Sequence, residues 1–146
     1  KGHKFGYENF KKKQILKLIK ICKEIIKKYK IKKKYIVGHS DIAPLRKIDP
    51  GEKFPWKFLA SNGVGIWHDF KPEFLKKYRK IKVTNKKDKI KFLKKLEKIG
   101  YCISSKKNFS LIKITKAFQR RFRKDLINGE IDEECLLIAT NLSKKL

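Results

Sequence analysis

Residues 35–51 read Tyr35-Ile36-Val37-Gly38-His39-Ser40-Asp41-Ile42-Ala43-Pro44-Leu45-Arg46-Lys47-Ile48-Asp49-Pro50-Gly51. The short apolar run at the start of this stretch is typical of a buried β-strand. Such a strand would deliver His39 at its carboxyl end, where α/β folds usually place their chemistry. The prolines and the glycine that follow exclude a continuous helix. We therefore predict an α/β fold in which a rigid loop with polar side chains follows a buried strand.

The segment before this strand has the periodicity of an amphipathic helix. Between Lys11 and Lys30, apolar residues recur at alternating steps of four and three, which predicts one apolar stripe made of Ile15, Ile19, Cys22, Ile26 and Tyr29. Asn9 is the expected N-cap of this helix. Beyond the loop, Pro55 is expected to open a short helix that ends near Gly63.

Residues 87–146 carry three further helical patterns. Their apolar positions are Ile90, Leu93, Leu96 and Ile99 in the first pattern, Leu111, Ile114, Phe118 and Phe122 in the second, and Cys135, Ile138 and Leu142 in the third. Ser110 and Asp132 are the expected N-caps of the second and third helices. We therefore divide the chain into residues 1–70, a polar linker over residues 71–86, and a three-helix module over residues 87–146.

The chain is strongly basic. It has 146 residues, of which 41 are Lys or Arg and 14 are Asp or Glu, so its formal net charge is +27. This charge favours anionic partners and raises nucleic-acid binding as one class of function. Of the basic residues, 36 are Lys and 5 are Arg, spread over every polar face. That composition favours codon bias in an AT-rich genome over a dedicated nucleic-acid surface, and we expect no specific nucleic-acid partner.

Other sequence features narrow the class of protein. No apolar run approaches the ~18 residues of a membrane span, so we expect no transmembrane segment. Cys22, Cys102 and Cys135 form neither a paired metal motif nor a disulfide framework, and we predict small buried thiols. We expect the protein to be a monomer.

The rigid loop carries residues that suit a metal site. Zinc accepts a neutral imidazole and a carboxylate, which His39 and Asp49 would supply. Lys47, two residues before Asp49, would place an ammonium beside the metal, where it would stabilise an oxyanion that forms on a carbonyl carbon. From spacing alone, a structural role for a single His and a single Asp remains the alternative.

Residues 38–56 closely resemble the second half of the zinc-dependent N-acetylmuramoyl-L-alanine amidases, the amidase family related to peptidoglycan recognition proteins. Gly2-His3-Lys4-Phe5-Gly6-Tyr7 resembles the loop after the central strand of that family, and Gly63-Val64-Gly65-Ile66-Trp67 resembles the end of its catalytic domain. Residues 114–132, with Ala117-Phe118-Gln119-Arg120-Arg121-Phe122-Arg123, resemble the small helical peptidoglycan-binding domain that often follows it.

This resemblance implies the C-terminal part of a mixed-sheet zinc amidase domain, followed by a three-helix peptidoglycan-binding domain. It matches His39 and Asp49 to two of the three zinc ligands, and Lys47 to the lysine that steadies the tetrahedral intermediate. The implied reaction is hydrolysis of the amide between N-acetylmuramic acid and L-alanine in peptidoglycan or muropeptides. The implied cofactor is Zn²⁺, and the implied compartment is the cell envelope or periplasm rather than the cytoplasm.

Two features depart from the family pattern. The first zinc-binding His and the Glu that handles the proton of the water have no counterpart in this sequence, so we expect the chain to begin after the strand that carries that Glu. Of the other histidines, His3 matches a position that binds no metal, and His68 follows Trp67 at the end of the domain. A non-catalytic peptidoglycan-binding fragment or decayed copy is therefore the alternative function.

Several side chains are candidates for substrate contact. Arg46 is expected either to be solvated or to pair with a carboxylate of the stem peptide. Trp56 is expected either to lie in the core or to form a sugar platform. Gln119, Arg120 and Arg123 are expected on the outward face of their helix, either in contact with glycan or peptide or as part of a solvated basic face. Asp41 is interpreted as structural, folding the loop by accepting backbone N–H groups.

Overall fold

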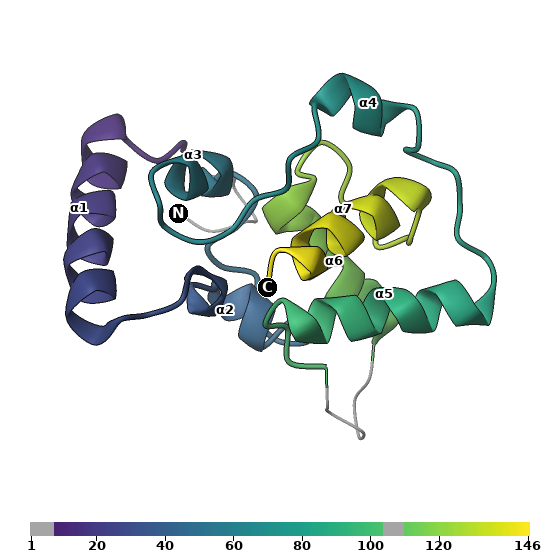
Figure 1. The fold of residues 1–146 in the computed structure, drawn as a ribbon. Coiled ribbons are helices and arrows are strands. Elements are labelled where there is room, and N and C mark those ends of the chain that lie inside the picture. Colours follow the sequence, from purple (N-terminus) through teal and green to yellow (C-terminus); the bar gives the residue numbers. More distant parts are fainter. Residues whose placement is uncertain (1–7, 104–109) are drawn as a thin grey trace.

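In the computed structural model, which describes residues 8–103 and 110–146, all regular structure is helical (Figure 1). The elements are α1 (Lys12–Tyr29), η2 (Lys33–Tyr35, a 3-10 helix), α2 (His39–Ile42), α3 (Trp56–Ser61), α4 (Pro72–Lys76), α5 (Lys86–Lys98), α6 (Leu111–Phe122) and α7 (Glu133–Lys144). The motif Gly2 to Tyr7, which includes His3, lies outside the described residues.

The expected strand and mixed sheet are wrong for this part of the chain. Residues 33–35 close a 3-10 turn in which the Tyr35 N–H donates to the Lys32 carbonyl at 2.9 Å, and Tyr35 is 62% exposed. Ile36 is extended, but a strand forms only where a neighbouring strand pairs with its backbone groups. Within residues 8–103 and 110–146 the only bridge of this kind joins Lys82 to Asp132. His39 therefore begins a helical turn instead of ending a strand.

The predicted first helix is confirmed, with two corrections. The N-cap is Lys11 rather than Asn9. Ile15 and Ile19 are buried against Leu59 and Val64, whereas Tyr29, at the end of the predicted stripe, is 64% exposed. The helix lies at one edge of the molecule, on the far side of α2 and α3 from α5 and α7 (Figure 1).

The three predicted C-terminal helices are also confirmed, and they enclose the larger core. The Ser110 hydroxyl accepts from the Lys113 N–H at 3.4 Å, and the Asp132 carboxylate accepts from the Cys135 N–H at 3.0 Å, so both predicted N-caps are present. The core contains Leu75, Val83, Phe92, Leu96, Ile99, Tyr101, Ile114, Ala117, Phe118, Phe122, Ile131, Cys135, Ile138, Ala139 and Leu142. The predicted Ile90 is not part of it, because that side chain is 43% exposed.

The segment predicted as a linker packs against this core. Residues 71–86 contain α4, and the side chains of Leu75 and Val83 are buried in the C-terminal cluster. The Arg79 guanidinium makes two hydrogen bonds to the Glu134 carboxylate, at 2.7 and 2.9 Å. Burial of Leu75 and Val83 and pairing of Arg79 hold this segment against the helical module.

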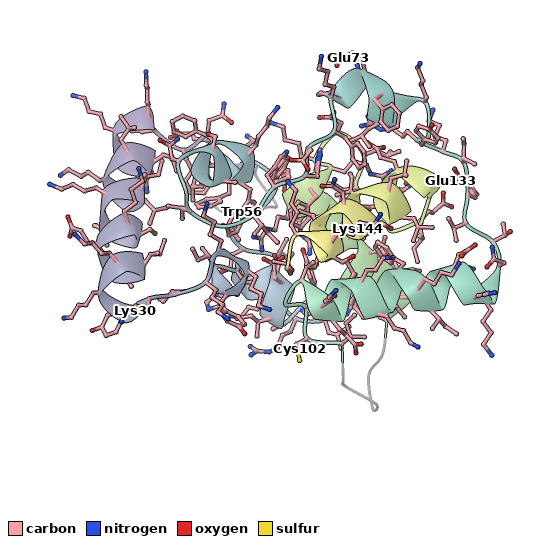
Figure 2. All side chains as sticks on the ribbon, viewed as in Figure 1. Lys30, Trp56, Glu73, Cys102, Glu133 and Lys144 are labelled. Carbon is pink, nitrogen blue, oxygen red and sulfur yellow. The ribbon has the colours of Figure 1, made fainter. Side chains whose placement is uncertain are left out.

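The N-terminal and C-terminal parts meet along α6. Helices α2 and α3 both pack against α6. Trp56, at the start of α3, lies between the N-terminal elements and the C-terminal helices (Figure 2). The loop that carries the candidate chemistry therefore rests on a helix of the other module.

Two remaining sequence predictions concern cysteines and membranes. Cys135 is buried, and burial raises the pKa of its thiol to about 12, whereas Cys102 is exposed, contrary to the prediction of buried thiols. Among the helices of the described residues, none has the length and apolar character that a membrane crossing needs.

Candidate active site

Gly38 and Asp41 shape the start of the candidate loop. The Asp41 carboxylate accepts the Gly38 N–H at 2.8 Å, which confirms its predicted role in folding the loop. A Cβ atom on Gly38 would lie 2.7 Å from Pro50 Cδ and 3.2 Å from Trp56 Cζ2. Glycine at this position therefore allows the two ends of the loop to approach each other closely.

His39 and Asp49 converge at the surface. The distance from His39 Nδ1 to Asp49 Oδ2 is 2.7 Å, and the Ser40 N–H donates to the Asp49 carbonyl at 3.0 Å. The two side chains are 68% and 57% exposed, so their polar atoms face solvent rather than the core. The structure thus brings together the imidazole and the carboxylate that the sequence singled out.

The electrostatic surroundings keep Asp49 ionised. Partial desolvation opposes ionisation, but the hydrogen bond with His39 and the charges of His39 and Lys47 outweigh it, and the pKa of Asp49 lies below its ordinary value. Lys47 is half-buried, and its backbone N–H donates to the Ala43 carbonyl at 2.9 Å. Arg46, by contrast, is exposed.

The donor pair suits zinc but is short of a full ligand set. An imidazole nitrogen and a carboxylate oxygen are common zinc ligands, and a catalytic zinc site uses three protein ligands. Within residues 8–103 and 110–146, no three His, Cys, Asp or Glu side chains form a group that could hold a metal. His68 is stacked on Trp67 with a centroid distance of 5.0 Å, and burial, together with the charge of Lys57, lowers its pKa to about 4.

Trp56 is held in the protein interior. It is 6% exposed, and the Arg121 guanidinium lies 4.1 Å from the centre of its ring. Together with Trp67 and His68, it lines a cavity of about 280 Å³ between the two modules, and neither His39, Lys47 nor Asp49 borders that cavity. Of the two roles predicted for Trp56, this placement agrees with a core position.

The sequence reasoning missed Arg121. The Arg121 Nη1 donates to Asp41 Oδ2 at 2.5 Å, and Nη2 donates to the Ile36 carbonyl at 3.0 Å. The sequence contains one weak signal for this role. Arg121 lies three residues after the core residue Phe118, which places it near the inward face of α6. In a sequence with so many basic residues, this spacing does not distinguish Arg121 from a solvated side chain.

The expectation of an outward polar face on α6 is wrong for two residues. Gln119 is fully buried, and its side-chain amide donates to the Glu130 carbonyl at 2.8 Å. Arg123 is 3% exposed and pairs with the Asp132 and Glu134 carboxylates. Both residues satisfy polar groups around the turn before α7, so neither is available to touch glycan or peptide.

Comparisons with known proteins find that this chain is similar to amidases. Residues 2–52 match the family described as N-acetylmuramoyl-L-alanine amidase. The chain is 38% identical over 138 residues to N-acetylmuramoyl-L-alanine amidase AmiD of Escherichia coli, covering 93% of this chain and 49% of that protein. A 50-residue segment is 50% identical to 1,6-anhydro-N-acetylmuramyl-L-alanine amidase AmpD of Haemophilus influenzae, covering 33% of this chain and 27% of that protein.

Solved structures give the same relationship. One is the complex of AmiD from E. coli with anhydro-N-acetylmuramic acid-L-Ala-D-gamma-Glu-L-Lys, with a TM-score of 0.79, 37% identity, and coverage of 96% of this chain and 55% of that chain. Another is AmpDH3 from Pseudomonas aeruginosa in complex with anhydromuramic pentapeptide, with a TM-score of 0.79, 28% identity, and coverage of 99% and 58%. The chain thus spans about half the length of AmiD.

Proposed function

We propose that the protein hydrolyses the amide between N-acetylmuramic acid and L-alanine, because residues 2–52 match the family described as N-acetylmuramoyl-L-alanine amidase. The observation that carries this proposal is the convergence of His39 and Asp49, 2.7 Å apart, on an exposed loop in the matched segment. Lys47 on the same loop adds a positive charge that acts on Asp49.

The substrate class follows from the relatives. AmiD and AmpDH3 have each been solved with an anhydromuropeptide, and their names or titles describe the muramyl-alanine linkage or its sugar. We extend this class, soluble muropeptides and the peptidoglycan from which they derive, to the present chain. The cell envelope is the proposed compartment because this polymer is found there.

Three residues of the loop have a defined role in the proposed reaction. His39 and Asp49 would hold zinc, which when bound supplies a Lewis acid and lowers the pKa of a water to ~7. Lys47 would place its ammonium against the carbonyl oxygen of the scissile amide and stabilise the negative charge that develops there. A third ligand and a group that accepts the proton of the water would come from residues other than those described.

A specific observation favours a second candidate. Only two metal-binding side chains converge within residues 8–103 and 110–146. A chain that holds zinc weakly, or not at all, would bind peptidoglycan without cleaving it. Residues 87–146 are our candidate for that binding, and co-sedimentation of the protein with insoluble peptidoglycan tests it independently of catalysis.

The central experiment measures metal and turnover together. In the complete gene product, His39→Ala should abolish stoichiometric zinc, measured by mass spectrometry of the purified protein, while His68→Gln retains it. Lys47→Ala should retain zinc and lower the release of stem peptide from anhydromuramoyl tripeptide by about a hundredfold, whereas Lys20→Ala on the exposed face of α1 should leave turnover unchanged.

The two candidates give opposite results in this experiment. Zinc bound at one ion per chain with measurable release of peptide supports the hydrolase. Binding of muropeptide without release, and zinc content unaffected by His39→Ala, would support the binding protein instead.

A further inference from the structure

The carboxylate of Asp41 joins the candidate loop to the helical module. It accepts the Gly38 N–H at 2.8 Å and the Arg121 Nη1 at 2.5 Å, both through Oδ2. The side chains of Asp41 and Arg121 are 1% and 2% exposed, so this ion pair is shielded from water. A buried carboxylate with these two donors has little freedom to move. Loss of Arg121 would leave its charge uncompensated in the interior, and loss of the Gly38 N–H would remove a hydrogen bond from it.

Arg121 is held as firmly as its partner. Its second terminal nitrogen donates to the Ile36 carbonyl at 3.0 Å, and its guanidinium is packed against Trp56 at 4.1 Å and Phe122 at 4.9 Å. A planar guanidinium with donors in a fixed fork fixes both the position and the orientation of the groups it binds. Lysine offers a single ammonium and lacks this fork.

The groups that Arg121 holds lie on both sides of His39. Arg121 binds Ile36, which precedes His39, and Asp41, which follows it by two residues. Asp41 also binds the N–H of Gly38, the residue directly before His39. The Asp41 carbonyl in turn accepts the Cys102 N–H at 3.3 Å, from the segment after α5. Lys113 of α6 donates to the Leu45 carbonyl at 3.2 Å, further along the same loop. His39 itself is exposed, so its backbone position depends on these flanking contacts.

We propose that Arg121 is a positioning residue for the proposed amidase site, because through Asp41 and Ile36 it holds the backbone that aims His39 at Asp49. The inference rests on the proposed function for its catalytic meaning, but its geometric content is independent of catalysis. It also gives the helical module a task besides binding, since Arg121 lies outside residues 2–52, the segment that matches the amidase family.

The test compares the buried Arg121 with the partly buried Arg79. Arg121→Met keeps the apolar stem and removes both donors, and Arg121→Lys keeps the charge without the fork. Arg79→Met is the matched control, because Arg79 pairs with Glu134 and Asp125 inside the helical module and its own side chain is 17% exposed. The thermal unfolding curve of each variant is measured first, and the comparison is made at a temperature at which all variants are folded.

The first readout needs neither zinc nor activity. In the metal-free chain, the ¹H–¹⁵N signals of the His39 imidazole, assigned with His39→Ala, report its hydrogen bond with Asp49. Arg121→Met should shift these signals to those of a solvated imidazole, Arg121→Lys should shift them partway, and Arg79→Met should leave them in place. Unchanged His39 signals in folded Arg121→Met and Arg121→Lys would overturn the proposal, whether or not the protein is an amidase.

The second readout applies to the zinc-loaded complete protein. Arg121→Met should lower kcat by about a hundredfold, with KM changed less than about threefold, because a misplaced group costs roughly that factor. Arg79→Met should keep kcat. Equal losses of kcat in the two folded variants would show that Arg121 is only structural. An inactive wild type with the expected His39 shifts would refute the proposed function and leave the positioning role standing.

Discussion

The two hydrophobic clusters of this chain differ greatly in size. Among the described residues, the N-terminal cluster buries four side chains, Ile15, Ile19, Leu59 and Val64, whereas the C-terminal cluster buries fifteen. The candidate loop lies in the sequence between the two parts of the smaller cluster, yet its buried anchor, Arg121, comes from a helix of the larger one. The difference indicates that the C-terminal helices supply most of the stability on which an exposed site depends.

Helix α1 illustrates the thinness of the smaller cluster. It buries Ile15 and Ile19 but leaves Leu16, Ile21 and Ile25 between 43% and 52% exposed. Figure 2 shows its lysines extending away from the rest of the molecule. Only the apolar side chains on the covered face of a helix are removed from water, so the exposed ones contribute little to stability.

The largest expected effect tests the C-terminal cluster. Phe118 is fully buried and contacts Phe92, with ring centroids 5.2 Å apart. Phe118→Ala should lower the free energy of unfolding by about 3–5 kcal/mol, because it removes a large apolar surface and leaves a cavity. Urea denaturation followed by circular dichroism measures this change. A loss below ~1 kcal/mol would mean that the larger cluster is not the main source of stability.

A smaller effect is expected in the N-terminal cluster. Ile19 is 6% exposed, and half-exposed neighbours surround it. Ile19→Ala should cost about 2 kcal/mol, at the low end for buried aliphatic truncations, because so thin a cluster can partly collapse into the space left. The same denaturation experiment measures it. If Ile19→Ala destabilises the protein as much as Phe118→Ala, the contrast between the clusters is wrong.

The smallest effect concerns pH and the junction between the clusters. Burial lowers the pKa of His68 from 6.5 to about 4, so between these values the unfolded chain binds a proton that the folded chain does not. Stability is therefore lost as pH falls through this window. The midpoint temperature of thermal unfolding should decrease when the pH is lowered from 7 to 5, and it should decrease less in His68→Gln. Parallel curves for the two proteins would contradict a buried neutral His68.

The sequence predicted the helices better than it predicted their surroundings. Apolar periodicity located α1, α5, α6 and α7, and the caps Ser110 and Asp132 followed from residue type alone. The run before Gly38 was misassigned as a strand, because strand formation depends on a pairing partner that local sequence does not reveal. In the described residues that run has no such partner.

The candidate site divides in the same way. His39, Lys47 and Asp49 were chosen on their spacing and family resemblance, and the structure places His39 and Asp49 in contact. Their assignment as metal ligands and catalytic residue stays a prediction. Arg121 was missed because it acts on a residue 80 positions earlier in the chain, and a pairing of that separation leaves no local pattern.

The placement of the aromatic residues makes the boundary between the two parts optically accessible. The chain has two tryptophans, Trp56 and Trp67, and both line the cavity between the modules. Trp56 lies under a guanidinium and Trp67 is stacked on an imidazole, so each indole has a cationic or ionisable neighbour. The tryptophan emission of this protein therefore originates at the boundary between the modules, and a change in its wavelength or intensity registers their separation without any attached dye.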